Sequence, residues 1–287
     1  MKRILIYIIF TSLLISCTHQ DVEQSNLIVE GWIEADRHPV VMLHKSYIAD
    51  TAKHTSTIEQ TLREHIVNWG KVTISDGENE VVMIGRLDTL YMPPYYYTTA
   101  DMKGEVGKTY TITAEYEGQI VSGTTTIPQP ADFSEIHVNQ TTDSTVRISA
   151  KIIDTTEIGQ RKYALFSRRI SEKQFLLNML GVFTKTSTSD TIEVLVNAPT
   201  SSILSQSKSV NLDYNKGDTI LLRLSTMDDT SYKFWSAFSS ISVASGVFFY
   251  PVYTNFPSNM SNDRGYFCGY GSTTHILILD RDSVYHY

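Results

Sequence analysis

The sequence is poor in the residues on which small disulfide-rich or zinc-binding folds depend, because it has only two cysteines in 287 residues. Two cysteines cannot form a disulfide framework or a four-cysteine zinc site. An excess of basic residues is also lacking: 24 Lys and Arg stand against 31 Asp and Glu, a net charge of −7. A surface that neutralises phosphates must be basic, so this composition argues against nucleic acid as a partner.

Glycine and proline are scarce, at 15 and 8 residues, and no low-complexity segment is present. Hydrophobic residues make up 41% of the chain and charged residues 19%, which is ordinary globular usage and excludes a disordered protein. What the chain does have is tyrosine, at 17 residues. Together with many short β-rich runs, this profile predicts a mainly β fold.

The N-terminus has the anatomy of a secretory signal peptide. Lys2 and Arg3 precede a short apolar run that ends in Ile15, Ser16 and Cys17. The run is shorter than the roughly 20 residues that a spanning helix needs. Its end resembles the lipobox of bacterial lipoproteins, in which the cysteine becomes the lipidated first residue. We therefore expect a cleaved signal peptide over 1–16, a lipidated Cys17, and a polar tether over 17–25 that holds the protein at a membrane. The alternatives are a plain signal peptide with an accidental cysteine and a buried N-terminal strand.

The residues after Cys17 bear on which membrane holds the lipid. Thr18 follows the cysteine, so the Asp associated with retention at the inner membrane is absent. Asp21 and Glu23 partly match the acidic stretch of surface-exported lipoproteins of Bacteroidota-like bacteria. The expected location is therefore the outer membrane, with the cell-surface side favoured over the periplasmic side.

Residues 26–128 are predicted to form an immunoglobulin-like Greek-key β-sandwich. Strong hairpin signals are Asp76-Gly77 and Glu117-Gly118, each between two β-rich runs. Tyr110, at the start of the clearest alternating run, resembles a tyrosine corner, although a simple core-facing aromatic would give the same pattern. The predicted strands cover residues 27–33, 40–43, 72–74, 81–84, 108–116 and 119–127.

Pro128 and Pro130 mark the best domain boundary, because proline cannot donate a ladder hydrogen bond. A second β-rich domain is expected over 132–287, with helices near 171–180 and 229–243. Gly181 suits the end of the first helix, and Asp228 and Asp229 suit the start of the second. The predicted strands of this domain cover residues 146–153, 162–168, 191–196, 219–225 and 275–279.

Several motifs in their order along the chain resemble a Bacteroidota lipoprotein family of unknown function, the family numbered 4249. They are Val29–Ile33, Val72–Gly77, Pro93–Tyr96, Tyr232–Trp235, Phe248–Pro251, Phe256–Met260 and Gly265–Ser272. The resemblance implies an outer-membrane lipoprotein with an immunoglobulin-like N-terminal part, of a kind often encoded beside TonB-dependent receptors. It implies no catalytic residue and no cofactor.

The sequence contains no motif that would supply catalysis or hold a metal. The eight histidines show no metal-ligand spacing, and no nucleophile elbow or phosphate loop is present. We therefore predict no catalytic residue, no metal site and no cofactor. Cys268 is left without a partner once Cys17 carries lipid, and we expect it to be buried and inert.

Aromatic residues beside proline and glycine are the candidate contacts for a ligand or partner, because rigid rings are typical of recognition surfaces. Packing within the sheets is the alternative role for these rings. The Gly265–Gly271 run is expected to bend an edge strand over packed rings. The candidate contact residues are Tyr91, Tyr95, Tyr96, Phe249, Tyr250, Phe256, Tyr266 and Tyr270.

The function that these features favour is a non-enzymatic binding or accessory module that works with a TonB-dependent receptor in ligand capture or uptake. A structural or adhesive surface lipoprotein is the alternative. A glycan or peptide hydrolase is the least favoured hypothesis, because the motifs of such enzymes are absent.

Overall fold

The computed structural model describes residues 26–46, 64–88, 94–172, 175–196, 213–245 and 256–287. These residues form a mainly β fold, as the sequence predicted, and include one helix. The strands are β1 (Leu27–Glu34), β2 (Val40–Lys45), β3 (Lys71–Ser75), β4 (Glu80–Leu87), β5 (Tyr95–Thr98), β6 (Thr109–Tyr116), β7 (Gln119–Thr126), β8 (Phe133–Gln140), β9 (Thr145–Ile153), β10 (Lys162–Arg169), β11 (Leu176–Thr184), β12 (Thr191–Val196), β13 (Tyr214–Asn215), β14 (Thr219–Met227), β15 (Gly265–Ile278) and β16 (Ser283–His286); the helix is α3 (Asp229–Ser245). No helix in this part of the chain is long and apolar enough to cross a membrane.

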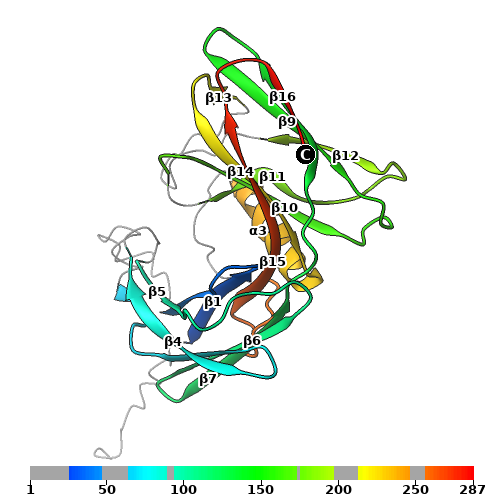
Figure 1. The fold of residues 1–287 in the computed structure, drawn as a ribbon. Coiled ribbons are helices and arrows are strands. Elements are labelled where there is room, and N and C mark those ends of the chain that lie inside the picture. The colour runs from blue at the N-terminus through cyan, green and yellow to red at the C-terminus, as the bar shows by residue number, and fades with distance from the viewer. Residues whose placement is uncertain (1–25, 47–63, 89–93, 173–174, 197–212, 246–255) are drawn as a thin grey trace, which may run out of the picture.

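One large sheet runs through both halves of the molecule (Figure 1). Its strand order is β11-β10-β14-β15-β1-β2-β5-β4-β3-β6-β7. The long strand β15 joins the halves: it pairs antiparallel with β14 and parallel with β1, where Val29 lies opposite Gly265. A smaller sheet of order β12-β9-β8-β16 covers the C-terminal half. The predicted boundary at Pro128–Pro130 therefore does not separate two sheets.

The buried hydrophobic residues among those described form three clusters: two large cores, most of whose residues lie on different sides of this boundary in the sequence, and a small cluster under α3. The first core lies among residues 27–127 and also takes Met260 and Phe267 from the C-terminal half. The second core lies between the large and small sheets, over residues 131–285. Phe267 of the first core and Leu277 of the second are an even number of residues apart on β15, so their side chains point to the same face of the strand. Both cores therefore lie on one face of the large sheet. We call this the core face.

The glycines of β15 allow another segment to cross this strand closely. A Cβ on Gly269 would lie 2.8 Å from the carbonyl oxygen of Thr126, and one on Gly271 would lie 2.2 Å from that of Pro128. Real Cβ atoms do not approach backbone this closely, so only glycine fits there. The expectation that this run bends an edge strand is wrong, because β15 has a neighbour on each side.

The hairpins follow the turn chemistry of the sequence. Gly77 has a φ of 91°, and Glu117 and Gly118 have φ of 48° and 79°, which are the positive values that tight hairpins need. β3 pairs with β4 and β6 with β7, as predicted. The Tyr110 hydroxyl accepts a hydrogen bond from the Glu105 amide at 2.9 Å and donates to the Lys103 carbonyl at 3.2 Å. Tyr110 thus makes the backbone bonds of a tyrosine corner while its ring is buried.

The helix predicted near residues 171–180 is wrong, because Leu176–Thr184 forms strand β11 against β10. A short apolar run is ambiguous between helix and strand, and pairing with β10 decides the outcome. Gly181 does not end a helix. It lies where the pairing with β10 becomes irregular, and a Cβ there would lie 2.7 Å from the Leu165 carbonyl oxygen.

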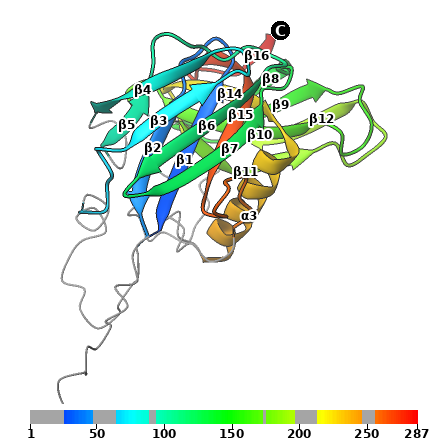
Figure 2. The same ribbon diagram turned by 90° about the horizontal axis from the view of Figure 1, so that it is seen from below.

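The predicted second helix is present as α3, which contacts β10, β11 and β15 (Figure 2). Asp228 caps it: one carboxylate oxygen accepts the Ser231 amide at 2.8 Å. The other oxygen accepts the Thr125 hydroxyl at 2.7 Å and the Thr126 amide at 3.3 Å. One side chain therefore holds both the start of α3 and the end of β7, which belongs to the other half.

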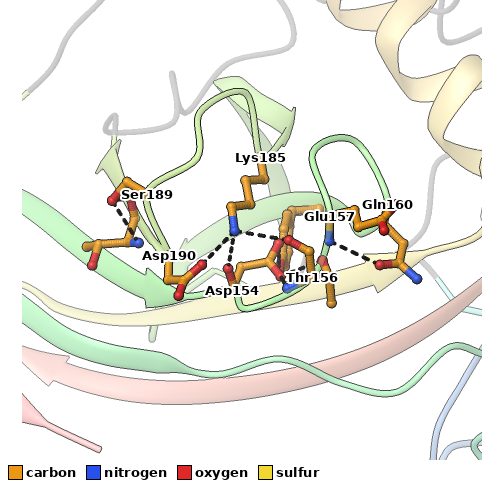
Figure 3. A network of polar contacts seen from close by, with 9 residues as sticks. Asp154, Thr156, Glu157, Gln160, Lys185, Ser189 and Asp190 are labelled. Atoms are coloured by element: carbon orange, nitrogen blue, oxygen red, sulfur yellow. Dashed lines mark hydrogen bonds and ion pairs between the residues drawn. The ribbon is translucent and has the colours of Figure 1, made fainter.

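A buried lysine fixes the loops beside the second core (Figure 3). The Lys185 ammonium donates to the carbonyl oxygens of Asp154 and Thr156 at 2.8 and 3.0 Å and to the Asp190 carboxylate at 2.8 Å. Asp154 is fully buried, and its carboxylate accepts hydrogen bonds from Thr156 and from the Tyr163 hydroxyl. The ammonium thus satisfies carbonyl groups that would otherwise be buried without a partner.

Candidate active or binding cleft

The face of the large sheet opposite the two cores carries a cleft of about 780 Å³. We call this the cleft face. Its side chains come from the alternate positions of β1, β2, β10, β14 and β15, from the turn after β1, and from α3. Trp32 and Glu34 of β1, for example, line the cleft, whereas Ile33 between them lies in the first core. Successive side chains of a strand point to opposite faces, so every second residue of these strands faces the cleft.

Aromatic rings form one wall of the cleft. Trp235 of α3 donates from its indole nitrogen to the Tyr270 hydroxyl at 2.6 Å. Its ring also lies 5.9 Å from Phe166 and 6.0 Å from Tyr266, centroid to centroid. Trp32 packs against the same cluster from β1. Edge-on rings at these separations support one another, so the wall is rigid before any ligand arrives.

Arginines form the other wall. The Glu34 carboxylate, only 7% exposed, lies 3.1 Å from Arg37 Nε and 3.4 Å from Arg223 Nη1. The guanidinium carbon of Arg223 lies 3.7 Å from the centre of the Phe175 ring, and that of Arg168 lies 5.1 Å from it. Arg223 thus shares the Phe175 ring with Arg168 and the Glu34 carboxylate with Arg37. Cation–π contact with Phe175 holds both groups in place.

Several positive charges lie close together in this wall, and they affect the pKa of Arg223. Burial lowers the pKa of Arg223, the Glu34 carboxylate opposes that shift, and the charges of Arg37 and Arg168 add to it. Among the described lining residues, four are Lys or Arg and three are Asp or Glu. The cleft therefore carries a positive excess in a protein whose net charge is −7.

The one cysteine in the described structure lies beneath the aromatic wall. Cys268 is buried, as predicted, and burial raises the pKa of its thiol to about 12. A thiol that stays protonated at neutral pH is a poor nucleophile. Cys268 therefore packs under α3 as a protonated thiol.

Comparison with known families decides the chain's membership. The profile of the family described as "Domain of unknown function (DUF4249)" matches residues 16–276. The chain belongs to the DUF4249 family. This agrees with the resemblance seen in its motifs, and it names no activity. No significant match exists among the curated proteins.

Two of the predicted contact residues of this DUF4249 chain, Tyr266 and Tyr270, lie in the cleft. Phe256 stacks near Phe234 of α3, at 5.8 Å between ring centroids. Tyr95 and Tyr96 lie elsewhere, on β5. The ring of Tyr95 packs against the first core and its hydroxyl donates to Asn68, whereas Tyr96 is half-buried. The remaining predicted residues, Cys17, Tyr91, Phe249 and Tyr250, lie outside the described residues.

Sequence reasoning missed the arginine wall. A usable signal was present in Arg223, which stands between Leu222 and Leu224 and interrupts the apolar run of β14. A charged residue in such a strand points to a second, polar face. Within the described residues, no group of three or more His, Cys, Asp or Glu is arranged to hold a metal ion.

Proposed function

We propose that this DUF4249 protein is a lipid-anchored outer-membrane protein that binds a ligand for a TonB-dependent receptor and is not an enzyme. The observation that carries the proposal is the preformed cleft on the cleft face. Its volume of about 780 Å³ is within the range of small-molecule sites. Its walls combine aromatic anchors with fixed polar groups, the combination that such sites use for affinity and orientation.

The groups in and under the cleft support binding rather than turnover. Glu34 is already paired with Arg37 and Arg223, so its carboxylate is engaged in holding the arginines in place. Cys268 is buried with a raised pKa, so it is a weak nucleophile. Tyr270, whose pKa burial raises well above its ordinary value, accepts a hydrogen bond from Trp235 and is held as a neutral phenol.

The proposed anchor rests on the N-terminal residues. Lys2, Arg3, the apolar run and Cys17 occur in the order of a lipoprotein signal. A Cys17→Ser variant should lose incorporation of labelled palmitate and move from the membrane fraction to the soluble fraction. Undiminished labelling and membrane partition of this variant would refute the anchor.

Finer features of the fold belong to the same proposal. We propose that residues 26–128 are an immunoglobulin-like Greek-key sandwich that β15 completes, followed by a β-rich second domain. Support comes from the bonds of Tyr110 and from the contacts of β7 with β1 and β15. Because Met260 and Phe267 belong to the first core, residues 26–131 alone should remain unfolded by circular dichroism and regain structure only with β15 supplied in the chain.

Co-purification tests the partnership. The lipidated chain, extracted in mild detergent from its own cells, should carry a TonB-dependent receptor with it. Trp235→Ala removes part of the aromatic wall and should reduce uptake of the receptor's cargo, while Trp69→Phe, at a 90% exposed site, should not. A chain that isolates alone, or appears in shed filaments, would contradict the proposal and favour a structural role.

A further inference from the structure

The arginine wall contains more positive charge than folding requires. Arg37, Arg168 and Arg223 are near enough to affect one another, and the Glu34 carboxylate pairs with two of them. Like charges held together in a partly buried site repel, and this lowers stability. Because this repulsion does not help the chain to fold, we look for a bound group that the arginines contact.

Arg168 shows where that role lies. Its Nη1 group donates to the carbonyl of Glu172, but its Nε–H is buried and meets no acceptor within the described structure. A buried charged donor without an acceptor is costly, and native proteins keep few of them. The guanidinium carbons of Arg168 and Arg223 lie 5.1 and 3.7 Å from the centre of the same Phe175 ring, so an anionic group with several acceptor atoms beside that ring would be near both guanidinium groups.

The aromatic wall lies in the same cleft as this pair. Trp32, Trp235 and Tyr266 supply flat apolar surface beside the guanidinium groups. A ligand that fills both walls must therefore have an anionic end and a flat apolar body. The cleft volume of about 780 Å³ admits a molecule of drug-like size.

We propose that the cleft binds a small amphipathic organic anion, with its carboxylate, sulfate or sulfonate at Arg168 and Arg223 and its apolar body on the tryptophan wall. This inference rests on the proposed binding function and names its ligand class. Its test uses the isolated protein without a receptor.

The test compares the binding of two dyes that have the same ring framework. Anilinonaphthalene sulfonate carries the anionic group, and phenylnaphthylamine lacks it. Trp69 is the only tryptophan besides Trp32 and Trp235, and it lies outside the cleft lining, so Trp69→Phe leaves a chain whose tryptophan emission reports on the cleft. The sulfonate should quench this emission and bind at least tenfold more tightly than the neutral dye. A simple apolar patch would prefer the more hydrophobic, neutral dye.

Variants in this Trp69→Phe background locate the charge selectivity. Arg168→Gln and Arg223→Gln should each weaken sulfonate binding about tenfold, the size of one charge-assisted hydrogen bond, and leave the neutral dye within twofold. Arg281→Gln removes the same charge at an 82% exposed side chain and should change neither affinity. Raised salt should weaken sulfonate binding only.

Equal affinity for the two dyes would overturn the inference. This comparison uses the chain with all its arginines, so it stays valid even if an arginine variant fails to fold. A loss with Arg281→Gln equal to that with Arg168→Gln would also overturn it, because net charge and not the cleft would then be responsible. Selectivity for the sulfonate without any co-purified receptor would support the inference and refute the partnership. A co-purified receptor without selectivity would do the reverse.

Discussion

The two faces of the large sheet are built from neighbouring residues of the same strands, and yet their chemistry differs. On the core face, Ile33, Leu222 and Phe267 pack into two dry cores. On the cleft face, the residues next to them, Glu34, Arg223 and Tyr266, are charged or aromatic and surround a cleft. Because the backbone is common to both, the difference must come from what each face is selected to contact.

Aliphatic burial accounts for the core face without any ligand, since apolar area removed from water is the main stabilising term of folding. The cleft face is unlike this. Its arginines repel one another and one of them has an unsatisfied buried donor, so folding alone gives no reason for them. Substitutions on the two faces should therefore separate stability from binding.

The largest expected effect is on the core face of β15. Phe267→Ala should lower the free energy of unfolding by about 3–5 kcal/mol, because it leaves a cavity in the first core. Phe267 is fully buried, whereas its neighbour Tyr266 is half-buried on the cleft face, so Tyr266→Ala should lower stability by much less. Urea denaturation of both variants measures this difference. Equal losses would mean that Tyr266 contributes as much to folding as the fully buried Phe267 does.

The next effect concerns the lysine beside the second core. Lys185→Met should lower stability by about 1–3 kcal/mol, because it leaves the carbonyls of Asp154 and Thr156 without their donor. Lys151→Met is the matched control: that ammonium pairs with Glu135 in contact with solvent, and its loss should hardly change the urea midpoint. If both variants unfold at the wild-type urea concentration, the network in Figure 3 does not support the second core.

A smaller, pH-dependent effect belongs to Asp154. Burial raises its pKa, but the hydrogen bonds from Thr156 and Tyr163 outweigh burial and hold the pKa below the ordinary value of 3.8. The folded-state pKa is thus lower than the unfolded one. The carboxylate's contribution is therefore complete above pH 3.8 and is lost as the pH falls through the lowered folded value.

The test is a comparison with Asp154→Asn across pH. At neutral pH the variant should be less stable by about 1 kcal/mol, the scale of one lost hydrogen bond. The gap between the two chains should narrow as the pH falls below 3.8. A gap that stays constant down to acid unfolding would show that ionisation of Asp154 contributes nothing. Thermal unfolding by circular dichroism at several pH values provides the measurement.

The sequence predicts the core face better than the cleft face, for physical reasons. Hairpins such as β3–β4 depend on local turn residues, here Asp76 and Gly77, and alternation marks which side chains face inward. The parallel pairing of Val29 with Gly265 joins segments far apart in the chain, and no local signal encodes it. The failed helix at 171–180 has the same cause, because β10 supplies the partner that makes Leu176–Thr184 a strand.

Half of the cleft could be predicted, because the aromatic and glycine run around Tyr266 and Tyr270 is unusual in itself. The other half could not. Arg37, Arg168 and Arg223 come from three separate segments, and although Arg223 stands between two leucines, nothing in the sequence shows that the three arginines meet. Only the order β10-β14-β15-β1 brings them to one wall.

The smallest expected effect is the sharpest test of the comparison between faces. Arg168→Gln should change the free energy of unfolding by about 0.5 kcal/mol or less, because relief of repulsion with Arg223 offsets the lost bond to Glu172. Arg169 is the matched neighbour. Its guanidinium lies 2.9 Å from Asp218 and 3.2 Å from Glu172, so Arg169→Gln should lower stability by about 1–3 kcal/mol.

Differential scanning calorimetry of the two adjacent variants gives the answer directly. If Arg168→Gln destabilises as much as Arg169→Gln, the arginine wall is part of the folded framework and the faces are not divided by role. If only Arg169→Gln destabilises, then Arg168 is dispensable for folding. A guanidinium that the fold retains at no benefit to its own stability is then explained by what it binds.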